Sequence, residues 1–270
     1  MKQTRKRVSL VIPAYNEERH LQACLEAVAA QTVAPWEVIV VDNNSTDRTA
    51  AIARSFPFVR LLAEPRQGIV HARNAGFAAA RGECIGRIDA DTVLPPDWVA
   101  HIGTFYDDLR HQHTAWSGAG AFSDVRFPRF VSWMYGLLAF RLNRLLIGHY
   151  TLWGSNMACT REQWRAVAGQ VCLRSDIHED LDLAIHLHQA GYAIAYDPSI
   201  KTDAELRPLH ANPRIRWEYL QWWPRTLRVH GKKAWPVVWF FGAFLLYIAS
   251  FAWVLAERVA QLFGRTPRPQ

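Results

Sequence analysis

Two aspartates that lie two residues apart are the first candidates for chemistry in this sequence. Asp89 and Asp91 follow an apolar run at 84–88 and precede a helical pattern that begins at 94–98, which is typical of a buried strand leading into a turn and a helix. Carboxylates this close repel each other unless a cation lies between them, and their hard oxygen atoms suit Mg²⁺ or Mn²⁺. A metal held there could bind a diphosphate. Alternatively, the pair is a solvated turn or helix cap, because Asp is common before helices.

Glu179 and Asp180 form a second acidic candidate. Apolar residues recur at helical spacing directly after them, so the pair stands at a helix N-terminus, where the helix dipole favours ionised carboxylates. An ionised carboxylate can take a proton from an attacking hydroxyl group, as a general base does. The alternative is a solvated capping cluster that also includes Asp176 and Asp182.

Short apolar runs alternate with helical patterns before the first acidic pair. The predicted strands are 8–12, 36–42, 59–62 and 84–88, and the predicted helices between them are 21–28, 49–55 and 68–80. This alternation predicts an α/β fold with a mostly parallel sheet and flanking helices. In such sheets the ligand crevice lies at the carboxyl ends of the strands.

The residues just after the predicted strands are polar. Residues 13–17 follow the first strand, Asp42 ends the second, and Asp89 and Asp91 follow the fourth. Because these strand ends share one edge of the sheet, we expect the loops to form one ligand site. Taken singly, Glu17 and Asp42 are interpreted as helix caps. No glycine-rich dinucleotide fingerprint follows the first strand and no P-loop motif occurs, which argues against a dinucleotide dehydrogenase and a P-loop protein.

Four motifs in order give the chain a resemblance to the family 2 glycosyltransferases. They are VIPAYNEE at 11–18, VVDNNSTD at 40–47, ARNAG at 72–76 and DAD at 89–91. The resemblance covers residues 8–200 and implies a GT-A fold, the Rossmann-like fold of nucleotide-diphospho-sugar transferases. It also implies an inverting hexosyltransferase that uses a nucleotide-sugar donor with Mn²⁺ or Mg²⁺, and we expect a UDP-sugar rather than GDP-mannose.

The resemblance also implies roles for individual residues. Asp91 would bind the metal that bridges the donor diphosphate, and Asp89 would lie near the ribose and the metal. Arg73 would neutralise phosphate or orient the sugar. Asp180 matches the general base, with Glu179 supporting it or positioning the acceptor. The expected donor-binding residues are Pro13, Ala14, Tyr15, Glu17, Asp42, Arg73 and Asp89.

Composition suggests an anionic partner. The net charge is +7 and the pI about 9.5. Twelve Trp residues without a basic repeat or zinc-ligand spacing fit a membrane surface and a phosphate-bearing substrate better than nucleic acid. The four cysteines show no C-x-x-C spacing and are interpreted as reduced thiols of a cytosolic domain.

Two segments suggest a membrane. Residues 234–256 carry no charge, and at about 1.5 Å per residue they are long enough for a transmembrane helix. More basic residues precede this segment than follow it, which predicts a catalytic domain on the cytoplasmic side. Residues 127–150 are apolar and aromatic but interrupted by Arg129, Arg141 and Arg144. They are expected either to lie on the membrane or to cover the sheet as an amphipathic helix.

We therefore predict a catalytic domain over residues 1–230, with a donor half at 1–125 and an acceptor half at 126–230, and a membrane anchor with a short tail at 231–270. The expected reaction transfers a sugar from the nucleotide to a lipid or lipid-linked acceptor at the membrane. Two alternatives remain. One is a non-catalytic membrane scaffold that binds nucleotide-sugars, and the other is a metal-dependent nucleotidyl or phosphoryl transferase.

Overall fold

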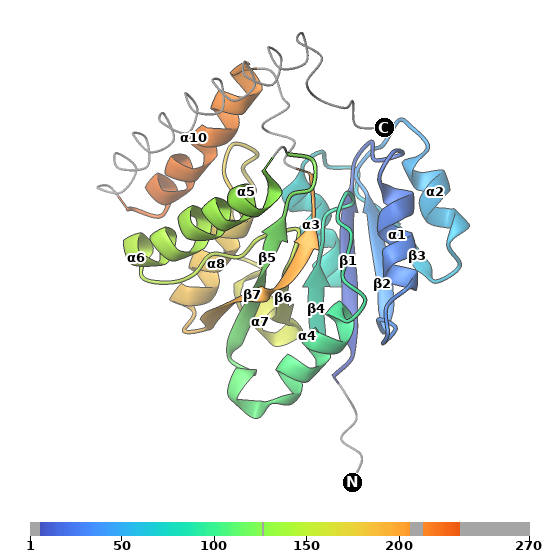
Figure 1. Ribbon diagram of the computed structural model, residues 1–270, viewed down its shortest axis with the longest axis horizontal. Coiled ribbons are helices and arrows are strands. Elements are labelled where there is room, and N and C mark those ends of the chain that lie inside the picture. The colour runs from blue at the N-terminus through green and yellow to red at the C-terminus, as the bar shows by residue number, and fades with distance from the viewer. Residues whose placement is uncertain (1–5, 126, 206–212, 233–270) are drawn as a thin grey trace. The chain divides into compact units, whose positions relative to one another are not determined.

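The computed structural model describes residues 6–125, 127–205 and 213–232. They belong to two compact units (Figure 1). The first unit consists of Met1–Ser175 and Glu179–Glu205, and the second of Asp176–His178 and Leu206–Gln270.

A seven-stranded sheet in the order β3-β2-β1-β4-β6-β5-β7 forms the centre of the first unit. Its strands are β1 (Val8–Ala14), β2 (Glu37–Asp42), β3 (Val59–Ala63), β4 (Cys84–Arg87), β5 (Thr114–Ala121), β6 (Met157–Thr160) and β7 (Ala193–Asp203). All neighbouring strands pair in parallel except β6, which is antiparallel to both β4 and β5. Because a single antiparallel strand separates them, β4 and β5 run in the same direction. The predicted mostly parallel α/β sheet is confirmed, and the carboxyl ends of β1, β2, β4 and β5 share one edge.

Helices cover both faces of this sheet (Figure 1). They are α1 (Leu21–Ala29), α2 (Thr49–Ser55), α3 (Ile69–Ala79), α4 (Trp98–Asp107), α7 (Arg161–Val167) and α8 (Glu179–Gln189). One buried cluster packs α1 and α4 against one face, and another packs α3, α7 and α8 against the other. Strand β1 is buried along its whole length, as expected for a parallel strand covered on both faces. The buried sheet therefore fixes the positions of the loops that follow its strands.

Helix α3 lies very close to the sheet. A Cβ atom at Gly76 would come within 2.3 Å of Val11 on β1, so the helix approaches the strand at a position where only glycine fits. This close packing fixes Arg73, one turn earlier on the same helix.

The segment expected to be helical at 127–150 is helical without a break from residue 128 to residue 147. Helix α5 (Pro128–Tyr135) continues into a π-helix, η2 (Gly136–Leu142), and then into α6 (Asn143–Ile147); Figure 1 labels α5 and α6. The last helix ends at Gly148, whose φ of 90° lies in the left-handed region that glycine adopts without strain. The chain then turns back toward the sheet and enters β6.

The second unit contains α10 (Pro213–Val229). Within this unit His178 contacts the rings of Tyr219, Trp222 and Trp223, so it is a packing residue. No helix among the described residues is both long and apolar enough to cross a bilayer. The predicted span at 234–256 lies outside the described residues.

Candidate active site

A buried cluster of charges surrounds Glu179 in the first turn of α8. Its carboxylate pairs with Arg73 of α3 and Arg87 of β4, and its carbonyl oxygen accepts a 2.8 Å hydrogen bond from Arg73 Nη1. All three residues are buried. Burial is the largest influence and opposes ionisation, but the charges of Arg87 and Arg73 together outweigh it and lower the pKa of Glu179 to about 2. Glu179 is therefore ionised at neutral pH, and its ion pairs join α8 to α3 and β4.

Arg87 connects this cluster to the first acidic motif. Its Nη2 atom donates to Asp89 Oδ1 at 2.9 Å, and Ser155 Oγ donates to Asp89 Oδ2 at 2.5 Å. Gly154 packs against the guanidinium group, where an added Cβ would lie 2.5 Å from Arg87 Cζ. Both oxygens of Asp89 are therefore fixed by side chains of the protein.

Asp180 is next to the cluster but differs in its electrostatics. The backbone N–H of Gly154 donates to Asp180 Oδ2 at 2.7 Å. Burial, and then the charge of Glu179, raise the pKa of Asp180 to about 7, although Arg87 and the Gly154 N–H oppose the increase. The helix dipole predicted a fully ionised carboxylate, and this prediction is corrected because burial and a neighbouring negative charge outweigh the dipole. A pKa near neutrality suits a group that takes up a proton during a reaction.

The loops after β1 and β2 form a second part of the site. Ala14 and Asp42 are register partners at the ends of these strands, and Asp42 Oδ1 accepts a hydrogen bond from Ser45 N at 3.1 Å. Asn16, whose φ of 54° is left-handed, accepts a 2.8 Å hydrogen bond from Thr46 N. This hydrogen bond joins the loop after β1 to the loop after β2. The exposed ring of Tyr15 lies on this edge.

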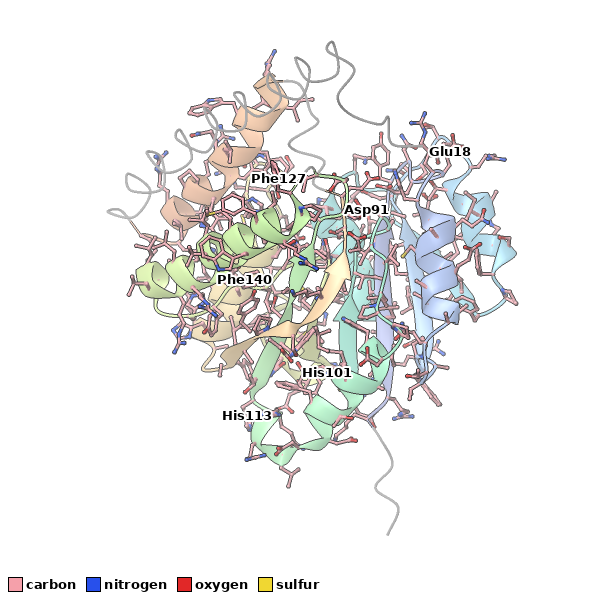
Figure 2. All side chains as sticks on the ribbon, viewed as in Figure 1. Glu18, Asp91, His101, His113, Phe127 and Phe140 are labelled. Carbon is pink, nitrogen blue, oxygen red and sulfur yellow. The ribbon has the colours of Figure 1, made fainter. Side chains whose placement is uncertain are left out.

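Acidic residues of the loops after β1 and β4 influence the buried thiol of Cys24 on α1. Burial raises the pKa of Cys24 far above its usual value, and the charges of Asp91, Asp89 and Glu17 raise it further. The Cys24 thiol also donates to the carbonyl oxygen of Asp89 at 3.7 Å, so the loop after β4 lies against α1. Figure 2 labels Asp91 at this end of the sheet.

The acidic loop after β4 fits a divalent cation. Asp91 is partly exposed, and carboxylate oxygens are the ligands that Mg²⁺ and Mn²⁺ prefer. Asp91 is the candidate for direct metal contact because an ion can reach its partly exposed carboxylate, and Asp89 adds negative charge in the same loop. The described residues therefore suit the cofactor that the motif implies.

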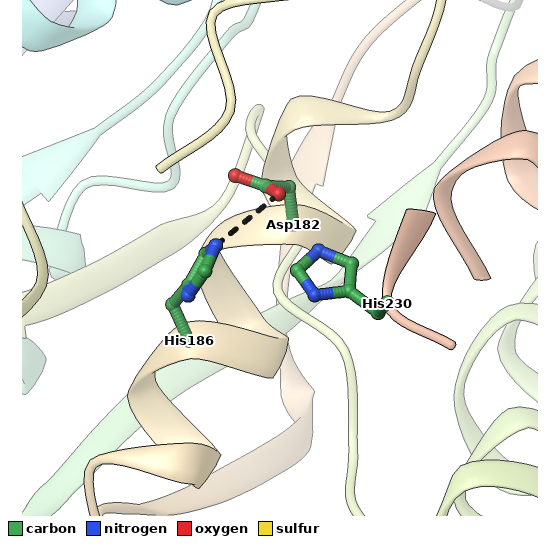
Figure 3. A group of neighbouring side chains, drawn as sticks. All are labelled: Asp182, His186 and His230. Carbon is green, nitrogen blue, oxygen red and sulfur yellow. Dashed lines mark ion pairs between the residues drawn. The ribbon is translucent and has the colours of Figure 1, made fainter. Parts of the chain in front are cut away.

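A separate acid–histidine pair lies further along α8. Asp182 Oδ1 and His186 Nε2 are 3.5 Å apart (Figure 3), and Asp182 Oδ2 accepts a hydrogen bond from the backbone N–H of Cys172. His230, also drawn there, belongs to the second unit. Since Asp182 is fully buried and anchors the 172 segment, we assign this pair a structural role in the first unit.

Three residues of the site were missed by the sequence analysis. These are Arg87, Gly154 and Ser155. Arg87 carried a detectable signal, because an arginine within a short, fully buried strand needs a carboxylate partner. Gly154 and Ser155 gave no such signal, because nothing in the sequence shows that they lie beside Asp89 and Asp180.

Comparisons with known proteins show the family and the fold of the chain. The family model described as "Glycosyl transferase family 2" matches residues 9–164. A chondroitin synthase of Pasteurella multocida is 38% identical over 96 residues, which are 34% of this chain and 10% of the relative. Glycosyltransferase AglE of Haloferax volcanii is 38% identical over 99 residues, which are 34% of this chain and 33% of the relative. The chain thus spans a third or less of the length of these relatives.

Solved structures show the same fold. A mannosyltransferase of Pyrobaculum calidifontis, solved with GDP-Man and Mn²⁺, superposes with a TM-score of 0.64 at 23% identity, covering 95% of this chain and 76% of that one. TarS of S. aureus, residues 1–349, solved with UDP-GlcNAc, gives a TM-score of 0.60 at 17% identity, covering 82% and 66%. At these identities the likeness is one of fold, and it confirms the expected GT-A architecture.

Proposed function

The chain belongs to glycosyl transferase family 2, and we propose that it is an inverting transferase that moves a sugar from a nucleoside diphosphate to an acceptor held at a membrane. The observation that carries the proposal is the continuous network from Asp180 through Gly154 and Arg87 to Asp89. This network supports the proposal because it joins Asp180, the proposed proton acceptor, to Asp89, the proposed acid on the donor side. A module that only bound nucleotide-sugars would have no use for Asp180 in this setting.

The proposed reaction uses Asp180 as the general base. Its carboxylate takes the proton of the acceptor hydroxyl as the acceptor oxygen bonds to the anomeric carbon. The bond from that carbon to the diphosphate oxygen breaks, and the nucleoside diphosphate leaves from the opposite face with its electron pair, so the configuration inverts. If the acceptor is a phosphate, it is already ionised, and Asp180 then positions it.

The leaving diphosphate needs positive charge. A divalent cation held by Asp91, with Asp89 nearby, would neutralise the diphosphate as a Lewis acid. Arg73 and Arg87 are already paired with carboxylates, so their role is to hold Glu179 and Asp89 in place. This revises the expectation that Arg73 contacts phosphate, since its guanidinium is fully buried.

The donor class is a nucleoside diphosphate sugar. Structures with a similar fold were solved with GDP-Man and with UDP-GlcNAc, so both bases are compatible with the architecture. The loops around Asp42 and Tyr15 would hold the base and ribose. Our sequence-based preference for a UDP-sugar is retained as part of the proposal.

The acceptor is proposed to be a lipid or lipid-linked molecule. The support is the uncharged stretch at 234–256, the net charge of +7 and the basic residues before that stretch. The catalytic unit would then act on the cytoplasmic side of the membrane.

A donor panel tests the proposal. Detergent-solubilised full-length protein is incubated with UDP- and GDP-sugars, Mn²⁺ and a membrane lipid extract, with Asp91→Ala as a matched variant. Turnover of one donor that is lost in Asp91→Ala supports a metal-dependent transferase. Binding of a sugar nucleotide without turnover in any acceptor fraction would favour the scaffold, and consumption of a nucleoside triphosphate would favour a nucleotidyl transferase.

A further inference from the structure

One segment of the first unit exposes an unusual amount of apolar surface. Six of the fifteen exposed large hydrophobic side chains among the described residues lie between positions 127 and 145. These are Phe127, Phe130, Trp133, Leu137, Leu142 and Leu145. Scattered exposed apolar residues are normal in soluble proteins, whereas a concentration of them marks an interaction surface. We call residues 127–147 the apolar ridge.

The ridge is not an ordinary helix that covers a sheet. Helix α5 contains aromatic residues and no buried residue, and Trp133 is 58% exposed. The inward contacts come from Tyr135 at the end of α5, which meets Phe122 and Trp153, and from Ala139, Phe140 and Ile147 in the following turns. Phe140, for example, stacks on Tyr196 of β7 with ring centroids 4.0 Å apart. The ridge is thus attached to the unit by one side and presents its aromatic side to the surroundings.

The charges on the ridge are all positive. Arg129, Arg141 and Arg144 are exposed, and no Asp or Glu occurs from residue 127 to residue 161. Exposed aromatic and leucine side chains combined with arginines are the features of a helix that lies in the interface of an anionic membrane. A second protein copy would require acidic groups to meet these arginines, and the ridge offers none for a self-complementary contact.

The ridge is placed next to the candidate active site. It follows β5, whose carboxyl end shares the site's edge of the sheet, and it leads through residues 148–153 to Gly154 and Ser155. Those two residues hold Asp180 and Asp89. In Figure 2, Phe127 and Asp91 are labelled at the same end of the sheet. A surface that contacted the ridge would therefore lie beside the site.

We propose that the apolar ridge docks on an anionic lipid bilayer and presents the active site to acceptors within it. The role of bringing acceptor to the site rests on the proposed function. The lipid contact itself does not, because it depends only on exposed apolar groups and positive charge.

The test measures the depth of one ridge residue in a bilayer. Leu145, 79% exposed, is replaced by cysteine in a full-length Cys172→Ser background and labelled with a nitroxide. The other cysteines, Cys24, Cys84 and Cys159, are buried. The matched control is Leu109→Cys, at a leucine that is 76% exposed and lies before the amino end of β5. Collision of each label with oxygen and with a water-soluble nickel chelate is measured in vesicles of phosphatidylcholine with and without phosphatidylglycerol.

The expected result is a label at Leu145 that is shielded from nickel and accessible to oxygen in anionic vesicles, while the label at Leu109 stays accessible to nickel. Each basic residue near an anionic surface strengthens binding by about fivefold. Arg129→Glu with Arg141→Glu should therefore restore nickel access at Leu145.

Two outcomes would overturn the proposal. One is equal nickel access at Leu145 and Leu109 in anionic vesicles. The other is a Leu145 label shielded equally with and without phosphatidylglycerol and unaffected by the arginine reversals, which would indicate cover by protein. If the label at Leu145 lies in the bilayer but no sugar nucleotide is turned over, only the proposed function is contradicted. If a sugar nucleotide is turned over but the label stays in water, only the docking of the apolar ridge is contradicted.

Discussion

Arg87 on β4 and Glu179 on α8 lie 92 residues apart in the sequence and form one buried ion pair. Arg87 also holds Asp89 at 2.9 Å. A single guanidinium group therefore joins the acidic loop expected to bind the donor to the helix that carries the proposed base. Substitutions in this network should therefore change both the stability and the activity of the protein.

Replacing Asp180 by Asn should abolish turnover and leave donor binding intact. The amide keeps the shape but cannot accept the acceptor's proton, and general-base catalysis contributes a factor of about 10² to 10⁴. The measurement compares kcat with calorimetric donor affinity, using an acceptor that carries a hydroxyl group. Asp108→Asn, at an exposed ion pair with Arg110, is the control and should retain activity. Near-normal turnover in Asp180→Asn would remove the base role.

Activity should rise with pH through neutrality. The pKa of Asp180 is raised to about 7, and only its deprotonated form accepts a proton, so kcat/KM falls on the acid side and levels off above pH 7. Below the pKa the loss should approach about tenfold per pH unit. The measurement is kcat/KM against pH with a hydroxyl acceptor. A flat profile between pH 5.5 and 8 would contradict the assignment.

Arg87→Met should destabilise the protein strongly and shift the acid limb of the pH profile upward. Removing one partner of a buried ion pair costs about 3–5 kcal/mol, and Arg87 is one of the groups that keep the pKa of Asp180 from rising further. Denaturant unfolding and the pH profile provide the two measurements.

The control for Arg87 is Arg7→Met. Arg7 pairs with Glu83 at 3.0 Å on the surface, and an exposed pair contributes little to stability because water and salt screen it. Equal stability losses for the two variants would show that the Arg87 cluster contributes no more than a surface pair.

Gly154→Ala should reduce activity although it adds one methyl group. The new Cβ would lie 2.5 Å from Arg87 Cζ, so the guanidinium group or the backbone at residue 154 must move. This movement should weaken the hydrogen bond from the backbone N–H of residue 154 to Asp180. Overpacking of this kind costs about 1–3 kcal/mol. Gly169→Ala is the matched control, because a Cβ there meets nothing within 4 Å. Equal activity in the two variants would contradict this arrangement.

Asp91→Asn should raise the Mn²⁺ concentration needed for half-maximal activity. The substitution removes one negative charge from the proposed ligand, and perturbing a metal site of this kind typically costs about 10- to 100-fold in affinity or activity. Titration of activity with Mn²⁺ after removal of metal by chelation measures the shift. Asp97→Asn, an exposed position six residues later, should leave the titration unchanged. An unchanged midpoint in Asp91→Asn would assign the metal elsewhere.

The sequence predicted the strands of the donor half because each is a short apolar run followed by a polar loop. It also placed Asp42, Asp89 and Asp91 at one edge, since parallel strands end on the same side. It could not predict that β6 pairs with β4, because that pairing joins residues that lie at least 70 positions apart in the sequence. The contact between Gly154 and Asp180 depends on this pairing, so it could not be predicted from the sequence either.

The electrostatics of α8 illustrate a second limit. Glu179 and Asp180 are adjacent acids at one helix start, and local rules treat them alike. In the structure one has its pKa lowered to about 2 and the other raised to about 7. The difference comes from Arg73 and Arg87, which reach Glu179 from distant parts of the chain.

The separation of these partners has a consequence for the order in which the protein is made. Arg73 and Arg87 leave the ribosome 106 and 92 residues before Glu179. Until Glu179 emerges, two guanidinium groups that belong in the interior lack their shared carboxylate, and burying them would be costly. A nascent chain that stops short of α8 should therefore keep α3 and β4 open to water. We therefore expect the donor half to complete its folding only after Glu179 has been synthesised.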